Sequence, residues 1–193
     1  MELLYALGLG YLLGSIPFGL ILTKAFGAGD LRNIGSGSIG ATNVLRTGRK
    51  GLAAATLLLD ALKGAVAVYL AAQWWPLAAP VAAFGAIVGH CFPVWLNFKG
   101  GKGVATALGI LLTLSWQIAL VCIAIWLMVF LISRISSVGG ISAAIAAAPA
   151  AWALGHGELI LPLVGIALVI LWRHRANIAR LRAGTEPRVG QKN

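Results

Sequence analysis

The chain has 193 residues, of which 60% are hydrophobic and 10% charged, and its mean hydropathy is +0.91. A soluble domain usually carries about a quarter charged residues, so this chain is too apolar to maintain a globular surface in water. Fifteen Lys and Arg against five Asp and Glu give a net charge of +10. In so apolar a chain this surplus favours anionic lipid or phosphorylated ligands over nucleic acid. The composition therefore predicts an integral membrane protein in contact with membrane lipid, with no nucleic-acid partner.

The two cysteines, Cys91 and Cys122, lie in apolar stretches without CxxC spacing or paired metal ligands. Neither a disulfide framework nor a metal site is expected from them. The first apolar stretch follows Glu2 instead of a basic region and has no A-x-A cleavage site at its end. We therefore expect it to remain in the protein as a transmembrane helix.

Six apolar runs are each long enough, or nearly so, to cross about 30 Å of hydrocarbon as a helix. They cover residues 3–23, 51–72, 78–96, 104–132, 138–154 and 159–172. As one helix, the run 104–132 would be roughly 44 Å long at about 1.5 Å per residue, more than one crossing needs. Ser115, Trp116 and Gln117 interrupt it with a polar and aromatic cluster typical of a membrane interface.

Charge placement decides how the long run is divided, because basic residues in short loops accumulate on the cytoplasmic side. Lys and Arg follow the first, third and last runs, whereas the linkers 73–77 and 155–158 contain none. A break at 115–117 places Arg134 on the same side as the other basic loops. We therefore predict an all-α integral membrane protein of seven transmembrane segments, with the amino terminus outside and the carboxyl terminus cytoplasmic. Residues 1–193 are expected to form one domain, with 183–193 as a disordered cytoplasmic tail.

The loop between the first two runs is rich in glycine. Its glycines at 35, 37 and 40 satisfy G-x-G-x-x-G, but no strand precedes them and a membrane helix follows, which excludes a dinucleotide fold. Such glycines can still present backbone N–H groups to an anionic oxygen, and an arginine adds a cation suited to phosphate. A flexible interhelical loop is the alternative. The candidate phosphate ligands are Gly35, Ser36, Gly37, Ser38, Thr42, Asn43 and Arg46.

A second glycine cluster precedes the fourth run. It is not a nucleotide-binding P-loop, because Leu96 stands where that motif needs Gly and Gly103 where it needs Ser or Thr. Glycines around a lysine just before a helix start nevertheless suit an anion, which the helix dipole also favours. A basic membrane anchor is the alternative. The candidates are Gly100, Gly101, Lys102 and Gly103.

The third cluster follows the last run. His174, Asn177 and Arg180 are spaced by three, so on a helix they share one face. Membrane anchoring explains the arginines of this segment equally well, but it does not explain His174 and Asn177. The small turn at 136–140 contributes Ser137 as a further hydroxyl candidate.

Three further features are expected to be structural. Asp60 and Lys63 lie three apart within the second run, where ionisable groups are costly enough to imply that they pair and face inward. His90 is expected to be a buried, hydrogen-bonded residue. The segment Gly14–Gly19 should let the first helix kink and pack closely.

Three segments in order, GSGSIGATNVLR at 35–46, FKGGKGVAT at 98–106 and RHRANIARL at 173–181, give the chain a close resemblance to a known family. It resembles the bacterial acyl-phosphate:glycerol-3-phosphate acyltransferases, the PlsY family, over nearly its whole length. The resemblance implies a seven-helix enzyme of the bacterial cytoplasmic (inner) membrane whose active site faces the cytoplasm. Its substrates would be acyl phosphate and glycerol 3-phosphate, its product lysophosphatidic acid, and it would use no cofactor and no acyl-CoA or acyl carrier protein donor.

The same resemblance implies roles for individual residues. Ser36, His174 and Asn177 are expected to act in catalysis, and the other candidates in the three clusters, with Ser137, in substrate binding. Two acceptors for the hydroxyl proton stay open: a phosphate oxygen of the acyl donor, and His174, whose side chain titrates near neutral pH.

Three other function classes have requirements that the sequence meets only in part. A phosphate or organic-anion transporter would also need basic loops, but it would place its anion site near the membrane midplane, often between repeated halves. An intramembrane serine hydrolase would need a serine beside a histidine, for which Ser36 and His174 qualify by composition alone. A phosphatidyl-alcohol transferase needs a cluster of acidic metal ligands, whereas only Asp30 and Glu186 are available on that side.

Overall fold

The computed structural model describes residues 1–190, and these contain helices and turns but no β-strand. They form two compact units, one over Met1–Leu114 and one that begins at Ser115. Each unit is a set of packed helices with its own hydrogen-bond network. The all-α class expected from the sequence is confirmed for the described residues, whereas the single domain over the whole chain stays a prediction.

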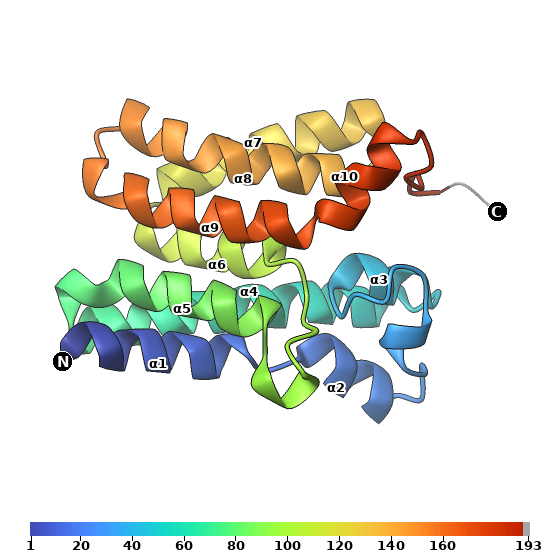
Figure 1. Cartoon of the computed structure of the whole chain (residues 1–193), viewed down its shortest axis with the longest axis horizontal. Coiled ribbons are helices and arrows are strands. Elements are labelled where there is room, and N and C mark those ends of the chain that lie inside the picture. Colours follow the sequence, from blue (N-terminus) through green and yellow to red (C-terminus); the bar gives the residue numbers. More distant parts are fainter. Residues whose placement is uncertain (191–193) are drawn as a thin grey trace. The chain divides into compact units, whose positions relative to one another are not determined.

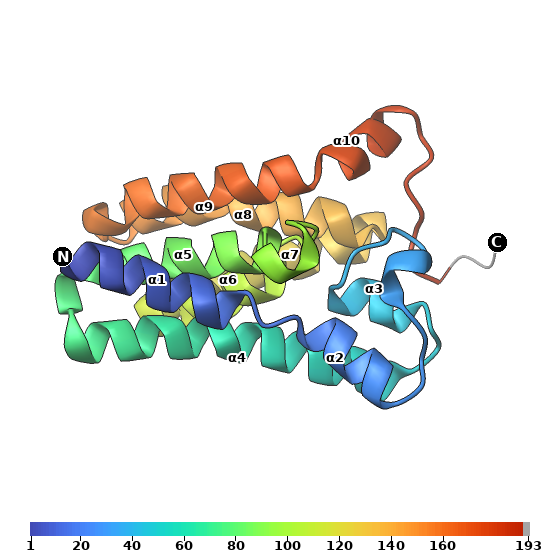
Figure 2. The ribbon, with the colours of Figure 1, turned by 60° about the horizontal axis from the view of Figure 1, so that its bottom comes forward.

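The first unit contains six α-helices. In Figures 1 and 2, α1, α4 and α5 lie side by side, and the short helices α2 and α3 lie beside the end of α4 where that helix begins. Three short 3-10 turns connect the longer elements: Leu31–Asn33, Pro76–Ala78 and Val94–Leu96. The helices are α1 (Glu2–Gly14), α2 (Phe18–Ala25), α3 (Ala41–Leu45), α4 (Lys50–Trp74), α5 (Ala79–Cys91) and α6 (Val104–Leu114).

Small residues let α1 and α5 approach each other closely. A Cβ atom on Gly10 or Gly14 would collide with the backbone of α5 at Ala82 or Ala86, so only glycine fits there. Past Gly14 the helix is interrupted before α2 resumes at Phe18, and Pro17, which has no N–H to donate, lies in the interruption. The kink and the close packing expected of this segment are both confirmed.

A buried ion pair provides a hydrogen-bond donor for the backbone at this interruption. Asp60 and Lys63 of α4 are both buried, and Lys63 Nζ lies 2.7 Å from Asp60 Oδ1. The same ammonium donates a hydrogen bond of 2.7 Å to the carbonyl of Ile16, between α1 and α2. In an apolar environment a backbone carbonyl released from a helix needs such a donor. The expected inward-facing pair is therefore confirmed, and it is anchored to the kink.

The second unit contains four α-helices: α7 (Trp116–Ser133), α8 (Ser136–Ala153), α9 (Ile160–Arg173) and α10 (Arg175–Arg182). Within this unit α8 packs against both α7 and α9 (Figure 1). A 3-10 turn, Gly157–Leu159, precedes α9. Helices α9 and α10 meet at a bend of 59°. His174 occupies that bend, as the residue between the two helices.

The predicted break in the long apolar run is confirmed. Helix α6 ends at Leu114 and α7 begins at Trp116, with Ser115 in an extended conformation between them. The Ser115 hydroxyl accepts a hydrogen bond from the N–H of Ile118 and so caps α7. It also lies 3.2 Å from Nε2 of His156, in the segment between α8 and α9. The polar cluster seen in the sequence thus begins a helix and ties it to the rest of its unit.

Five helical segments in the described residues are long and apolar enough to cross a membrane, or six if the bent pair α9 and α10 is one span. Helix α6 is apolar but shorter, with 11 residues. A multi-span membrane protein is therefore confirmed, whereas the count of seven segments and the orientation of the termini stay predictions. The five segments are Glu2–Ala25 (α1 with α2), Lys50–Trp74, Pro76–Leu96, Trp116–Ser133 and Ser136–Ala153.

The segment after α10 differs from the disordered tail that we expected from residue 183. Residues 183–190 follow a defined path, and the N–H of Val189 donates a 2.8 Å hydrogen bond to the carbonyl of Arg134. The side chain of Glu186 is only 5% exposed, because three donors hold its carboxylate. The expectation is therefore corrected for 183–190, and its remainder, 191–193, lies outside the described residues.

Candidate functional site

The glycine-rich loop of the first unit is organised by one buried amide. Asn43, in the one-turn helix α3, is 2% exposed. Its Nδ2 group donates to the carbonyls of Leu31, Ile34 and Ser38 at 2.8–2.9 Å. Its Oδ1 atom accepts from the N–H of Ser36 at 3.2 Å. Asn43 was predicted as a phosphate ligand, but its amide is occupied by the loop backbone, so the geometry gives it a positioning role.

Arg46 lies over Gly35, the first glycine of the motif 35–46. A Cβ on Gly35, where φ is +52°, would collide with the Arg46 guanidinium and the Asn43 amide. The guanidinium also approaches Asn43 Oδ1 at 3.4 Å. Glycine is therefore required at this position both by its backbone conformation and by the space that the arginine fills.

In this loop, side-chain hydroxyls are better placed to bind a ligand than backbone N–H groups, because two of those N–H groups are used within the loop. The N–H of Gly37 donates to the carbonyl of Ile34 at 2.9 Å, and that of Ser36 is held by Asn43. This differs from the expected nest of N–H groups, because the turn that brings these residues together uses those donors itself. Ser36 and Thr42 are exposed, and Ser38 is half-buried. The ligand-binding capacity of the loop therefore rests on these side chains and Arg46.

The second glycine cluster folds back onto the end of α5. The N–H of Gly100 donates to the carbonyl of Cys91 at 3.1 Å, and that of Gly101 to the carbonyl of His90 at 3.0 Å. These two N–H groups are therefore directed at α5. The sequence had instead led us to expect them to face a ligand. Lys102 is half-buried, and Gly103, with φ +88°, turns the chain into α6, which begins at Val104. The expected lysine just before a helix start is confirmed.

His174 of the second unit is held in one tautomer. Its side chain is buried, and Nδ1 lies 2.8 Å from the carbonyl oxygen of Ile170, one turn earlier in α9. A carbonyl oxygen can only accept, so Nδ1 carries the proton in this contact. In the neutral imidazole, Nε2 is then the nitrogen that can accept a hydrogen bond or a proton.

A carboxylate joins two of the predicted residues of this unit. Glu186 Oε1 accepts a hydrogen bond of 2.6 Å from the Ser137 hydroxyl and another from the Asn177 amide. Its Oε2 atom accepts from Arg180 Nε at 2.7 Å. Partial burial raises the pKa of Glu186, but the hydrogen bonds from Ser137, Asn177 and Arg180, with the arginine charge, bring it below its ordinary value. Glu186 is therefore a carboxylate that fixes α8, α10 and the following segment to one another.

Glu186 was not predicted as a site residue, because it follows the third motif in a segment that we expected to be a disordered tail. One signal could have found it: the chain has only five acidic residues, and an isolated acid close to a cluster of arginines needs a partner. Among the described residues, no group of three or more His, Cys, Asp or Glu is arranged to hold a metal ion.

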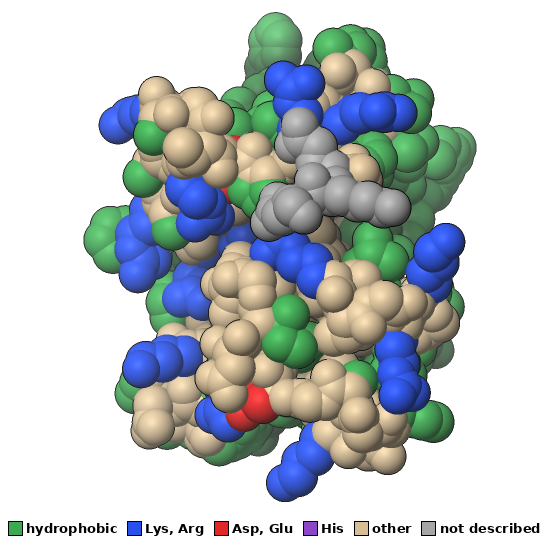
Figure 3. Space-filling view, turned by 90° about the vertical axis from the view of Figure 1, so that its right-hand side faces the viewer, with side chains coloured by type: hydrophobic (Ala, Val, Ile, Leu, Met, Phe, Trp, Pro, Cys, Tyr) green, Lys and Arg blue, Asp and Glu red, His purple; other side chains and the backbone are tan. Residues whose placement is uncertain are grey.

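The electrostatic character of the surface follows from the composition. Lys and Arg side chains are frequent on the face that Figure 3 shows, whereas Asp and Glu are few. Such an excess attracts phosphorylated molecules. Of the acidic groups, Asp30 is paired with Arg32 at 2.6 Å, and the hydrogen bonds and charge of that arginine lower the pKa of Asp30 to about 2.

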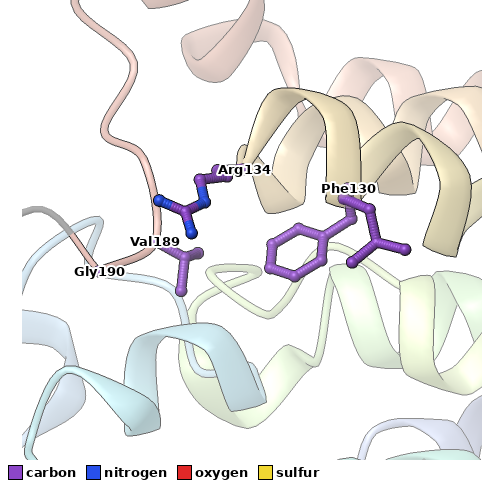
Figure 4. A pocket seen from close by; sticks show the side chains of 5 residues that line it. Phe130, Arg134, Val189 and Gly190 are labelled. Atoms are coloured by element: carbon purple, nitrogen blue, oxygen red, sulfur yellow. The ribbon is translucent and has the colours of Figure 1, made fainter.

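A pocket of about 430 Å³ lies where α7 ends in the second unit. Figure 4 shows the ring of Phe130 and the guanidinium of Arg134 directed toward Val189. None of the sequence-predicted site residues lines it; the lining residues are Phe130, Leu131, Arg134, Val189 and Gly190. This pocket is therefore not formed by the residues predicted from the sequence.

Comparisons with known proteins agree on one family. A family model described as "Glycerol-3-phosphate acyltransferase" matches residues 4–184. A glycerol-3-phosphate acyltransferase of Erythrobacter litoralis is 59% identical over 184 residues, 95% of this chain and 93% of that protein. The crystal structure of PlsY (YgiH), an integral membrane glycerol 3-phosphate acyltransferase, in its glycerol 3-phosphate form has a TM-score of 0.92 at 38% identity. Its lysophosphatidic acid form has a TM-score of 0.91 at 36% identity; in both cases 98% of this chain and 96% of the other are covered.

The Glu186 network predicts a pH-dependent stability. Because its pKa is lowered on folding, Glu186 stabilises the fold above its ordinary pKa of 4.5, and this contribution is lost as the pH falls through the lowered value. At pH 7, Glu186→Gln should reduce the free energy of unfolding by about 1.5–3 kcal/mol, the range for a hydrogen bond to a charged group. The deficit should shrink below pH 4.5. Thermal unfolding of the purified protein in detergent at several pH values measures both effects.

Glu158→Gln is the matched control, because the Glu158 side chain in the same unit is 67% exposed. It should leave stability nearly unchanged. If both variants behave alike at pH 7, the carboxylate of Glu186 does not hold these elements together.

Proposed function

Because the chain belongs to the glycerol-3-phosphate acyltransferase family, we propose that it transfers a fatty acyl group from acyl phosphate to the 1-hydroxyl of glycerol 3-phosphate. The products are lysophosphatidic acid and inorganic phosphate, and no cofactor takes part. The observation that carries the proposal is that the family match spans all three motifs, whose side chains are those that two phosphorylated substrates require. Acyl-CoA and acyl carrier protein are not donors in this proposal.

The charge of the substrates explains the choice of side chains. Two phosphomonoester-like groups bring roughly three to four negative charges into one site, at about 1.5 to 2 each. Arg46 and Lys102 supply cations, and Ser36 and Thr42 supply hydroxyl donors. Planar arginine suits a bidentate contact with phosphate, whereas lysine acts as a point charge. The first motif, 35–46, contains no carboxylate to oppose this charge, and Asp30, which precedes it, is paired with Arg32.

The proposed site residues are those expected from the sequence, with Asn43 reassigned to positioning. Ser36, His174 and Asn177 are the proposed catalytic residues, and Ser137 belongs to the binding set through its hydroxyl. The hydrogen bonds from Ser137 and Asn177 to Glu186 give both side chains a fixed direction. The binding set comprises Ser36, Ser38, Thr42, Arg46, Lys102, Ser137, His174 and Asn177, and the predicted glycines Gly35, Gly37, Gly100, Gly101 and Gly103 belong to it through the shape that they give the two loops.

Placement in the membrane follows from the positive-inside rule. The loops that carry the three motifs are the basic ones, so the proposed site faces the cytoplasm of a bacterial inner membrane. Seven transmembrane segments, with the amino terminus outside, satisfy this rule. An acyl donor would then keep its chain among the lipids while its phosphate reaches the motifs at the membrane surface.

The reaction needs an acceptor for one proton. The hydroxyl oxygen of glycerol 3-phosphate attacks the acyl carbon, the bond from that carbon to the phosphate oxygen breaks, and the hydroxyl proton must leave. We assign this proton to a phosphate oxygen of the donor, whose second pKa is near neutrality like that of other phosphomonoesters. His174, with Nδ1 bonded to Ile170, would then orient the substrate through Nε2.

Donor selectivity tests the proposed reaction. Purified enzyme is incubated with glycerol 3-phosphate and either acyl phosphate, acyl-CoA or no donor, and lysophosphatidic acid and phosphate are followed. Acyl phosphate has a good leaving group of its own, so we expect product with that donor alone. Turnover with acyl-CoA would contradict the assigned donor. Uptake of glycerol 3-phosphate into vesicles without any product would favour the transporter alternative.

Arg46 is expected to bind phosphate and not merely to anchor the loop. A charge-assisted contact contributes about 1.5–3 kcal/mol, so Arg46→Ala should lower kcat/KM at least about tenfold. The protein should still insert and purify. Lys50→Ala is the control, since Lys50 is an exposed cation at the start of α4 with no place in the proposed site. Equal losses in the two variants would indicate that general positive charge, and not a specific contact, supports activity.

The role of His174 is tested by its pH profile. If His174 only orients the substrate, His174→Gln should lower kcat about tenfold without changing the profile, since a lost general base typically costs about 10²–10⁴-fold. A fall of about a thousandfold, with loss of an acidic limb near about pH 6.5, would instead show that the enzyme supplies the base. Measurement of kcat from about pH 5.5 to 9 separates these outcomes.

A further inference from the structure

A buried polar network of the first unit lies outside the residues to which we have assigned binding or catalysis. It consists of Asp60 and Lys63 of α4 and His90 near the end of α5, all three buried. Asp60 Oδ1 lies 2.7 Å from Lys63 Nζ and 3.7 Å from His90 Nδ1. Burial of ionisable groups inside an apolar helix bundle costs free energy, so such groups often have a functional role.

His90 joins this network to the second glycine cluster. Its backbone carbonyl accepts the N–H of Gly101 at 3.0 Å. Its imidazole fills the space beside Gly101 where a side chain would stand, because the three atoms nearest to a Cβ built there all belong to the His90 ring. The adjoining Gly100 is pressed against the carbonyls of His90 and Cys91 in the same way. Residues 100 and 101 therefore follow the surface of His90, and the next residue is Lys102.

The network has a fixed support on its other side. Lys63 donates to the carbonyl of Ile16, so the position of the Asp60 carboxylate is set by the kink between α1 and α2. One edge of the imidazole faces this carboxylate and the ring lies against Gly101. The orientation of the ring, and with it the course of the glycine segment, is thus determined from within the unit.

We propose that His90 is a positioning residue for the acyl transfer: held by the Asp60–Lys63 pair, it sets the place of Lys102 and so the binding of a substrate phosphate. This inference rests on the proposed function, because it needs Lys102 to bind phosphate. His90 itself touches no substrate. His90 contributes through its contact with the backbone of Gly101 and through the packing of the imidazole ring. This contribution should therefore disappear in a variant that has no charged side chain at position 102.

A double-mutant cycle on kcat/KM and KM tests this. The variants are His90→Leu, Lys102→Ala and the pair, with both phosphorylated substrates varied in turn. We expect His90→Leu to raise KM at least about fivefold for the same substrate whose KM Lys102→Ala raises. In the Lys102→Ala background, His90→Leu should then change that KM by less than about twofold, because the two residues act as one unit.

His90→Asn and Val88→Ala are the companion variants. Asn keeps a polar group close to the position of Nδ1 but lacks the part of the ring that lies against Gly101, so His90→Asn should raise the same KM, and it should purify even if His90→Leu does not fold. Val88 is half-buried on the same helix and has no polar group, so Val88→Ala reports loss of α5 packing alone and should leave KM unchanged.

The outcomes are distinct. A purely structural His90 would lower the yield and kcat of His90→Leu without raising KM selectively, and its effect would persist in the Lys102→Ala background; either result overturns the inference. An unchanged KM for both substrates in Lys102→Ala would overturn it as well, by removing the group on which His90 acts. The proposed reaction fails separately, by absence of lysophosphatidic acid from the wild-type enzyme.

Discussion

In an apolar bundle every backbone group that a helix releases needs a partner inside the protein, and this constraint shapes each interruption of the chain. At the kink after α1, the released carbonyl of Ile16 is satisfied by Lys63. At the start of α7, the hydroxyl of Ser115 accepts the N–H of Ile118. At the bend between α9 and α10, the ring of His174 adds a second hydrogen bond to the carbonyl of Ile170, which also accepts the backbone N–H of His174. The interruptions are therefore the places where polar side chains are concentrated, and polar side chains are what a catalytic site needs.

The scarcity of acidic residues has a consequence for ligand binding. Three of the five acids are engaged by cations: Asp30 by Arg32, Asp60 by Lys63 and Glu186 by Arg180. These pairs remove the negative charges that would repel a phosphate, while the surplus of Lys and Arg is retained. We therefore propose that the net charge of +10 does more than anchor the protein in the membrane: in the proposed site, Arg46 and Lys102 supply cations for the substrate phosphates.

Much of the fold could be predicted from the sequence because hydropathy and charge are local signals. Apolar runs indicated the long helices, and the charge of Arg134 required a break at Ser115, which the structure contains. The Asp60 and Lys63 pair followed from their spacing of three. The motifs also indicated the segments in which we propose the site. These inferences need only neighbouring residues or a count of loop charges.

Contacts between distant residues could not be predicted in the same way. Glu186 bonds to Ser137 across 49 positions, and no local pattern connects an acid after one helix with a serine at the start of another. Asn43 was expected to face a ligand, since a polar residue in a glycine loop has no sequence feature that separates a ligand from a support. The N–H groups of Gly100 and Gly101 were assigned to an anion because their use by α5 depends on how the chain folds back.

Asn43 and Glu186 each hold one part of the motifs in place, but Asn43 is neutral and Glu186 is charged. This difference follows from the hydrogen-bond partners that each side chain has. The glycine loop needs both donors and acceptors to hold its backbone, and a neutral amide at Asn43 supplies both without adding a negative charge near Arg46. A carboxylate there would accept the N–H of Ser36 but could not donate to three carbonyls, and it would neutralise the arginine. Around Glu186, by contrast, every partner is a donor, so an acceptor with two oxygens is required. Its charge is tolerable because Arg180 compensates it, which leaves Asn177 beside a neutral pair instead of an unpaired anion.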